Sequence, residues 1–166
     1  MKVLIAVFLA TSAFGQKVQV ESDQAVNFNQ FRTFAIRQAH LSSRNPSLNN
    51  ELIRKRLNAD IERYAGERGL VLQSSGRSDL NLIYTLGSAR GTQTETYPAG
   101  WRGWGTRVVR VPYAEGTLVI DLRDPQSHSL VWRAIVRTDQ SDASKIESKL
   151  DDMVKKAFTK YPPKSK

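Results

Sequence analysis

Alternation of hydrophobic and polar residues is clearest between positions 117 and 136. Leu118, Ile120 and Leu122 recur with a period of two, which places three aliphatic side chains on one face of a strand. Asp124-Pro125 then interrupts the pattern, because proline lacks an N–H group and Asp before Pro favours a turn. A second set resumes at even positions, at Leu130, Trp132, Ala134 and Val136. The pattern predicts an antiparallel hairpin in which paired residue numbers sum to an even value, so that both sets share a face.

Two segments have the spacing of three and four residues that is typical of an amphipathic helix. The apolar stripe of residues 48–68 consists of Leu52, Ile53, Leu57, Ile61, Tyr64 and Ala65. That of the last predicted helix consists of Ile146, Leu150, Met153, Val154, Ala157, Phe158 and Tyr161. Gly69 suits the end of the first helix. Ser144, with Glu147 three residues later, predicts a capping box at the start of the second.

Shorter alternating runs predict strands over residues 17–21, 33–36 and 80–86, with a polar loop over 37–47. The predicted order is therefore β-β-α-β-β-β-α, without regular alternation of strands and helices. This order favours a two-layer α+β fold: an antiparallel sheet of about five strands with both helices packed on one face.

The segment 87–107 differs from the rest in being rich in glycine, and it predicts a long loop between strands. It is also the candidate binding surface, because Trp and Arg contribute disproportionately to interfaces. The candidate residues are Trp101, Trp104, Arg90, Arg102, Arg107 and Arg110. The alternative is that both indole rings fold back onto the sheet as a cover, with glycine only permitting the turns.

The first fifteen residues predict a secretory signal peptide. Lys2 precedes an apolar block over residues 3–10, and Ala13 and Gly15 suit cleavage before Gln16. The block is too short to span a bilayer. Residues 1–15 are thus the expected signal peptide and residues 16–166 a single exported domain, periplasmic or secreted. Cysteine is absent, which excludes disulfides, thiolate metal sites and a lipid-modified N-terminal cysteine.

Basic residues number 25 against 16 acidic ones, for a formal net charge of +9. Because an exported protein seldom meets nucleic acid, and because the basic residues are scattered over both predicted helices, attraction to anionic envelope surfaces is the favoured interpretation. The expected partner is an envelope protein or an anionic envelope polymer, with no nucleic acid and no transmembrane segment in the mature chain.

The residues that usually carry catalysis form no recognisable constellation. His40 and His128 lie among polar residues without metal-ligand spacing. Residues 100–105 lack the Gly-Lys-Ser/Thr ending of a phosphate loop. We therefore predict no catalytic residue, metal or cofactor. Asp121 is expected to form a cross-strand ion pair with Arg133 on a wet face of the sheet, and Trp132 to lie in the core.

The order of several short motifs resembles a known family. These motifs are Asn-Phe-x-x-Phe-x-Thr-Phe over residues 27–34, Gly69-Leu70, Asp79-Leu80, Tyr-x-Glu-Gly-Thr-Leu-Val-Ile-Asp-Leu over 113–122, and Leu-Val-Trp-Arg over 130–133. Together they resemble the bacterial domain-of-unknown-function family 4136 (DUF4136), mostly small exported proteins and lipoproteins, over about residues 17–160. The resemblance implies an α+β fold, a cell-envelope location and no established activity, and it supplies no catalytic or ligand residues. Unlike many relatives, this chain has no cysteine to lipidate.

Three functions remain open on the sequence. The leading one is a non-enzymatic binding or structural module of the envelope that uses residues 87–107. The alternatives are a hydrolase acting on envelope polymers, which needs a cleft with two carboxylates or a liganded metal, and a small-molecule carrier, which needs an enclosed apolar pocket between sheet and helices.

Overall fold

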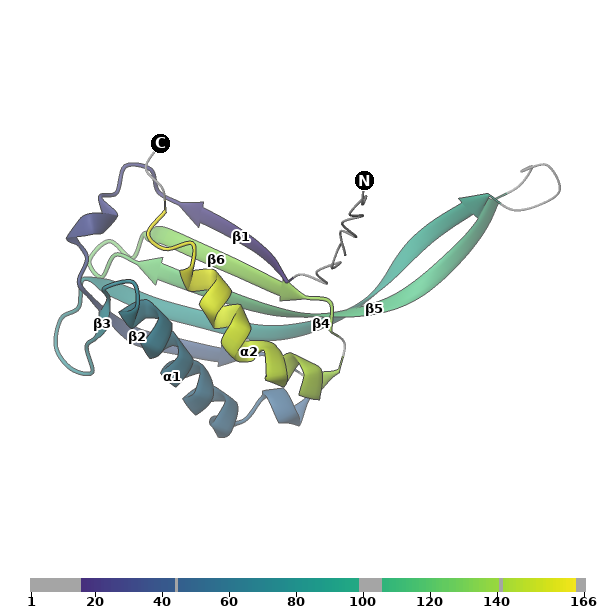
Figure 1. The fold of residues 1–166 in the computed structure, drawn as a ribbon, viewed down its shortest axis with the longest axis horizontal. Coiled ribbons are helices and arrows are strands. Elements are labelled where there is room, and N and C mark those ends of the chain that lie inside the picture. The colour runs from purple at the N-terminus through teal and green to yellow at the C-terminus, as the bar shows by residue number, and fades with distance from the viewer. Residues whose placement is uncertain (1–15, 44, 99–105, 141, 164–166) are drawn as a thin grey trace, which may run out of the picture.

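The computed structural model describes residues 16–43, 45–98, 106–140 and 142–163, and for residues 88–98 and 106–115 it describes the backbone only. One six-stranded sheet, in the order β1-β6-β5-β4-β2-β3, is covered on one face by two helices (Figure 1). The predicted two-layer α+β class is confirmed. The elements are β1 (Lys17–Ser22), the 3-10 helix η1 (Phe28–Gln30), β2 (Thr33–Leu41), the 3-10 helix η2 (Pro46–Leu48), α1 (Glu51–Gly66), β3 (Val71–Leu72), β4 (Leu80–Pro98), β5 (Thr106–Arg123), β6 (Leu130–Thr138) and α2 (Ala143–Phe158).

The β5–β6 hairpin has the predicted register. Leu118 pairs with Val136, Ile120 with Ala134 and Leu122 with Trp132, so every pair sums to an even value. All six side chains are fully buried against the helices. The prediction that Trp132 belongs to the core is confirmed: its ring stacks on Phe158 of α2 at 5.9 Å between centroids.

The sheet is mixed rather than wholly antiparallel, because β2 runs parallel to both β3 and β4. α1 lies between β2 and β3 in the chain, and a helical crossover returns the chain in its original direction. β2 is also longer than the prediction and extends into the expected loop over 37–47. After a register shift between Ile36 and Gln38, it stays paired with β4 as far as Leu41 and Leu86.

Two details of the predicted helices are wrong. Leu52 does not join the buried stripe of α1 but is 76% exposed, because it follows the N-cap residue Asn50 on the outer side of the first turn. The cap of α2 is Asp142 rather than Ser144: the Asp142 carboxylate accepts the backbone N–H of Ser144 at 2.8 Å. No helix in the described ranges has the length and apolar character needed to cross a membrane.

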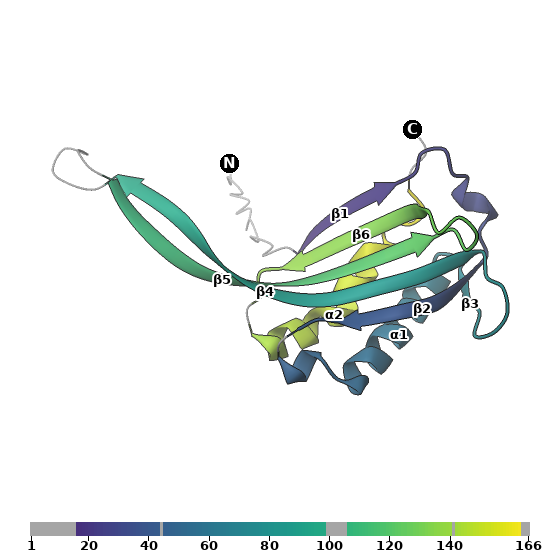
Figure 2. The same cartoon turned by 180° about the vertical axis from the view of Figure 1, so that it is seen from behind.

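The predicted loop over 87–107 is largely wrong, because β4 continues to Pro98 and β5 begins at Thr106. Their ladder runs from Asn81 opposite Arg123 to Pro98 opposite Thr106. The part formed by residues 88–98 and 106–115, called the arm below, projects as a two-stranded ribbon away from the sheet and the helices (Figures 1 and 2). The loop was predicted because this segment is rich in glycine, a residue typical of turns.

Candidate functional site

The arm has no neighbouring strand on either side within the described chain. β2 accompanies β4 only as far as Leu41 opposite Leu86, and β6 accompanies β5 only as far as Thr138 opposite Gly116. Beyond these pairs the two strands bond only to each other, so both outer edges carry unpaired backbone groups. Such edges are templates for an additional strand.

The predicted site residues fall partly within the arm. Trp101, Arg102 and Trp104 lie outside the described residues. Arg90 is opposite Ala114, Arg110 opposite Thr94 and Arg107 opposite Tyr97. The rows of Arg90 and Arg107 are seven residues apart along β4, roughly 23 Å at about 3.3 Å per residue, so the three described arginine positions do not meet at one point of the arm.

A second candidate surface, which sequence analysis did not identify, is the sheet face turned away from the helices, called the open face below (Figure 2). Pairing across β1, β6, β5, β4 and β2 assembles it in rows from segments far apart in the chain. Its members are Lys17, Gln19, Glu21, Gln38, His40, Ile83, Thr85, Thr117, Val119, Asp121, Arg123, Arg133, Ile135 and Arg137.

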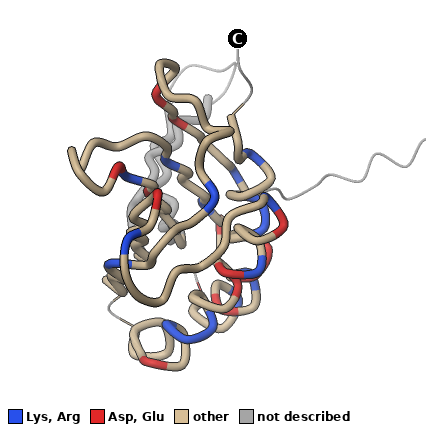
Figure 3. Tube along the Cα trace, turned by 90° about the vertical axis from the view of Figure 1, so that its left-hand side faces the viewer, with Lys and Arg blue, Asp and Glu red and all other residues tan. Residues whose placement is uncertain are grey.

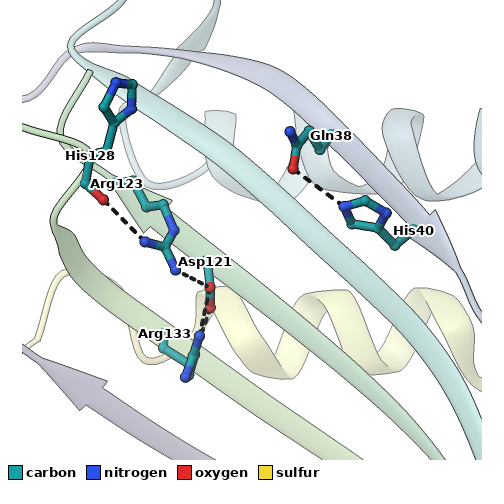
Figure 4. Close-up of polar contacts among 6 residues, drawn as sticks. All are labelled: Gln38, His40, Asp121, Arg123, His128 and Arg133. Carbon is teal, nitrogen blue, oxygen red and sulfur yellow. Dashed lines mark hydrogen bonds and ion pairs between the residues drawn. The ribbon is translucent and has the colours of Figure 1, made fainter. Parts of the chain in front are cut away.

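Asp121 holds two guanidinium groups on the open face (Figure 4). Arg133 donates from Nε to Oδ1 and from Nη2 to Oδ2, both at 2.7 Å, and this bidentate bond raises the pKa of Arg133. Arg123 donates from Nη2 to Oδ2 at 3.3 Å and from Nη1 to the carbonyl of His128 at 3.0 Å. The predicted Asp121–Arg133 pair is confirmed, and Asp121 is only 7% exposed although it lies on the sheet face that the helices leave uncovered.

The two histidines do not converge on a common site. Nε2 of His40 lies 3.3 Å from Oε1 of Gln38, whereas His128 is in the β5–β6 turn with a φ of 58° (Figure 4). Asp124 organises that turn by accepting the backbone N–H groups of Gln126 and Ser127, and the bond from Ser127 is the main cause of its lowered pKa. In the part of the chain that the structure describes, no three His, Asp or Glu side chains are placed to hold a metal ion.

Two carboxylates approach each other between α1 and α2. Arg63 pairs with Asp151 on α2 and with Asp60 on its own helix, and the Tyr64 hydroxyl lies 3.0 Å from both carboxylate oxygens of Asp151. Burial raises the pKa of Asp60, with a smaller contribution from the negative charge of Asp151. Sequence analysis missed this cluster because its partners come from different helices. Because Arg63 bridges the two carboxylates, the cluster serves as a polar contact between the helices.

Among the described residues, two hollows can be placed at edges of the sheet. A groove of about 410 Å³ runs between α1 and the β2–β3 edge, beside Ile36, Lys55 and Leu72, and a smaller one of about 160 Å³ lies between the ends of β1 and β6. Between the sheet and the helices, side chains such as Leu57, Tyr84 and Leu150 are completely buried.

Basic residues are distributed over the strands and both helices rather than gathered in one stretch (Figure 3). Several on the helices are neutralised locally, as in Arg54–Glu51 at 3.3 Å and Lys156–Asp152 at 2.9 Å.

These features define a two-layer α+β domain with a projecting β-ribbon and one uncovered sheet face. The chain belongs to the family described as domain of unknown function DUF4136, whose model matches residues 18–163. The resemblance expected from the motifs is confirmed. No curated protein matches the chain in sequence.

The solved structures that share the fold include the following two. One is a PDZ domain protein from Parabacteroides distasonis, with 15% identity and a TM-score of 0.58, over 90% of this chain but only 35% of that one. The other is a PelC dodecamer from Paraburkholderia phytofirmans, with 11% identity and a TM-score of 0.50, over 87% of this chain and 95% of that one. At such identities the likeness concerns the fold alone.

Proposed function

We propose that this protein is a non-enzymatic binding or structural module of the bacterial cell envelope, exported by means of residues 1–15. Its proposed contact element is the arm together with residues 99–105, which connect the two arm strands in sequence and are called the tip below. The observation that carries the proposal is the arm itself, in which β4 and β5 outrun every neighbouring strand of the described sheet. An isolated two-stranded ribbon is marginally stable in water and becomes stable when a further strand or surface packs on it. A partner that pairs with its edges supplies that surface.

The sequence of the tip supports the same role. Trp101, Arg102 and Trp104 belong to the residue types that most often dominate binding energy, and in the sequence they fall between β4 and β5. Arg90, Arg107 and Arg110 add positive positions along the ribbon. The PelC structure, a dodecamer with a similar fold, further supports a role in assembly, since a module of this fold is there repeated in a multimer.

The test compares the mature chain, residues 16–166, with a variant in which residues 89–115 are replaced by Asn-Gly. Because Ser88 and Gly116 are paired, a two-residue turn joins them without disturbing the sheet below. We expect the mature chain to sediment as an oligomer or to co-sediment with isolated envelopes, and the variant to do neither while keeping its Tm. Equal association of both proteins would show that the arm is not part of the interface. Absence of association in both would refute the proposal.

A matched variant, Trp101→Ala with Trp104→Ala, separates the tip from the ribbon. Loss of association with an unchanged Tm assigns the indoles to binding. A fall in Tm of several degrees without loss of association assigns them to a cover over the sheet, the alternative left open by the sequence.

A further inference from the structure

The open face brings together like charges with no carboxylate between them. Lys17 of β1 lies directly opposite Arg137 of β6, and Arg137 is opposite Thr117 of β5 on its other side. No described residue forms an ion pair with either cation. Like charges directly opposite each other in a sheet are destabilising, so this row is a stability cost that a bound anionic group would relieve.

A second group of charges lies four residues away along β6, where two carboxylates face two guanidinium groups. Asp121 is shared between Arg123 and Arg133, and Glu21, exposed and opposite Arg133 on β1, is the one other carboxylate on the described face. Arg133 uses Nε and Nη2 for Asp121, which leaves Nη1 free to donate elsewhere. Asp121 thus holds the guanidinium groups in a fixed orientation while leaving donors available to a partner.

Three aliphatic side chains lie between and beside these charges. Val119 pairs with Ile135 in the row between Arg137 and Arg133, and Ile83 is opposite Asp121 on β4. All three are half-buried. Both helices lie on the other side of the sheet, so neither covers this face (Figure 2). Apolar surface beside a charge excludes water from an incoming ion pair and thereby strengthens it.

The chemistry of the face points to a protein partner. Arginine, which predominates, binds carboxylates in a bidentate manner. The described part of the face carries no Phe, Tyr or Trp on which sugar rings or bases could stack, whereas its aliphatic centre suits apolar side chains. We propose that the open face docks an acidic protein segment, whose carboxylates pair with Lys17, Arg137 and Arg123 and whose apolar side chains cover Val119, Ile135 and Ile83. This surface is separate from the arm and does not rest on the function proposed for it.

The test uses the ¹⁵N-labelled mature chain and a soluble copolymer of L-glutamate and L-leucine as probe, followed by NMR chemical shifts. We expect shifts at the amides of Val119, Ile135 and Arg137, a Kd that rises with salt, and binding about tenfold weaker in Lys17→Glu/Arg137→Glu, the effect of roughly 1.4 kcal/mol. The control Lys149→Glu/Lys160→Glu makes the same charge change at exposed positions of α2 and the residues after it, and it should bind the copolymer nearly normally. If the reversed variant does not fold, Lys17→Gln/Arg137→Gln replaces it, with a smaller loss expected.

Three outcomes would overturn the proposal. Chemical-shift changes confined to the helices, or equal weakening of binding by both charge-reversed variants, would show that the copolymer responds to the net charge of the protein and not to the open face. Tighter binding of polygalacturonate, or of vesicles containing phosphatidylglycerol, would assign the face to an anionic polysaccharide or to a lipid surface. Absence of any binding would leave the face without an acidic partner. The Asn-Gly variant lacking the arm should bind the copolymer as the mature chain does, so that failure of one proposal leaves the other standing.

Discussion

Asp79 and Thr33 bond to each other in both directions across the start of two parallel strands. The Asp79 carboxylate accepts the backbone N–H of Thr33 at 2.9 Å, and the Thr33 hydroxyl accepts the backbone N–H of Asp79 at 2.9 Å. The same carboxylate oxygen accepts the N–H of Arg32 at 2.8 Å. These bonds fix β2 beside β4 immediately before the first ladder pair, Phe34 and Leu80. They give a physical reason for the parallel pairing that the sequence pattern did not predict.

Replacement of Asp79 by Ala should therefore lower the free energy of unfolding by about 1–2 kcal/mol, since the carboxylate's hydrogen bonds are lost at an exposed site. Thr33→Val removes only the hydroxyl bond and should cost about half as much. Urea denaturation of both variants measures the difference. A loss for Asp79→Ala no larger than that for Thr33→Val would show that the carboxylate does not hold the strands.

The same contact predicts a dependence on pH. The N–H groups of Arg32 and Thr33 hold the pKa of Asp79 below its ordinary value of 3.8, the bond from Arg32 being the main cause. For a lowered pKa the stabilisation is complete above 3.8 and disappears as the pH falls through the folded-state pKa. The stability difference between wild type and Asp79→Ala should thus be constant from about pH 5 to 7 and shrink below pH 3.8. A difference that persists unchanged at acid pH would contradict the prediction.

Most of the family motifs in this sequence contain residues whose contacts hold the fold together, as the bonds between Asp79 and Thr33 do. Thr33 and Asp79 bond to each other, Asp121 holds Arg133, and Trp132 packs on Phe158. Such motifs could be identified from local sequence because burial of alternate residues fixes the register of a hairpin strongly. They predicted the core and the class of the fold, and they carry no chemistry that indicates a function.

The candidate surfaces could not be predicted in the same way. The row of Lys17 and Arg137 exists only because the first strand pairs with the last one, a contact between distant segments that no local pattern encodes. The arm has a related cause: Gly87 and the Thr-rich residues after it have the composition of a loop, and only the long ladder with β5 makes them a strand. Leu52 has the spacing of the apolar stripe of α1 and yet is exposed. The spacing identifies one side of a helix but does not show how far along that helix the sheet and the other helix cover it.

Gly116, in the Glu-Gly-Thr motif, allows α2 to approach β5 closely. A Cβ atom there would lie 3.0 Å from Cγ2 of Thr138 and 3.1 Å from both Cγ atoms of Ile146. Gly116→Ala should therefore destabilise the protein by about 1–3 kcal/mol, as other overpacked cores are. Gly66→Ala is the matched control, since nothing lies within 4 Å of the position its methyl group would take and alanine favours a helix, so this variant should be neutral or up to about 1 kcal/mol more stable. Thermal denaturation distinguishes them, and equal effects of the two variants would exclude the steric account.

The ionised carboxylate of Asp60 should destabilise the fold at neutral pH, because it is largely buried. Its side chain is 14% exposed, its Oδ2 has no hydrogen-bond partner among the described residues, and burial raises its pKa above 3.8. For a raised acid pKa the folded state binds the proton more tightly, so wild-type stability should rise as the pH falls through the folded pKa towards 3.8. Asp60→Asn removes the charge and should raise Tm at pH 7 by about 2–4 °C, the shift typical of about 1 kcal/mol in a domain of this size. That advantage should vanish near pH 4. A lower Tm at pH 7 would mean that the pair with Arg63 outweighs burial.

Tyr84 and Tyr161 form a matched pair for the value of a buried hydroxyl. Both rings are buried, and burial raises the pKa of each to about 12. Tyr84 donates its hydroxyl to Oδ1 of Asn58 at 2.8 Å, whereas the Tyr161 hydroxyl has no partner among the described residues. Tyr84→Phe leaves Asn58 without its donor and should cost about 1–2 kcal/mol, while Tyr161→Phe relieves an unsatisfied group and should be neutral or stabilising.

The two tyrosines also set the alkaline limit of the fold. Because their folded pKa values exceed the ordinary 10.0, the folded state keeps protons that the unfolded chain releases, and stability should fall as the pH rises from 10 towards 12. Each Phe variant should show a shallower fall over that range, measured by urea denaturation at fixed pH steps. If Tyr161→Phe instead costs as much as Tyr84→Phe at pH 7, the Tyr161 hydroxyl must itself be hydrogen-bonded, for example to an ordered water, and the contrast between the two rings fails.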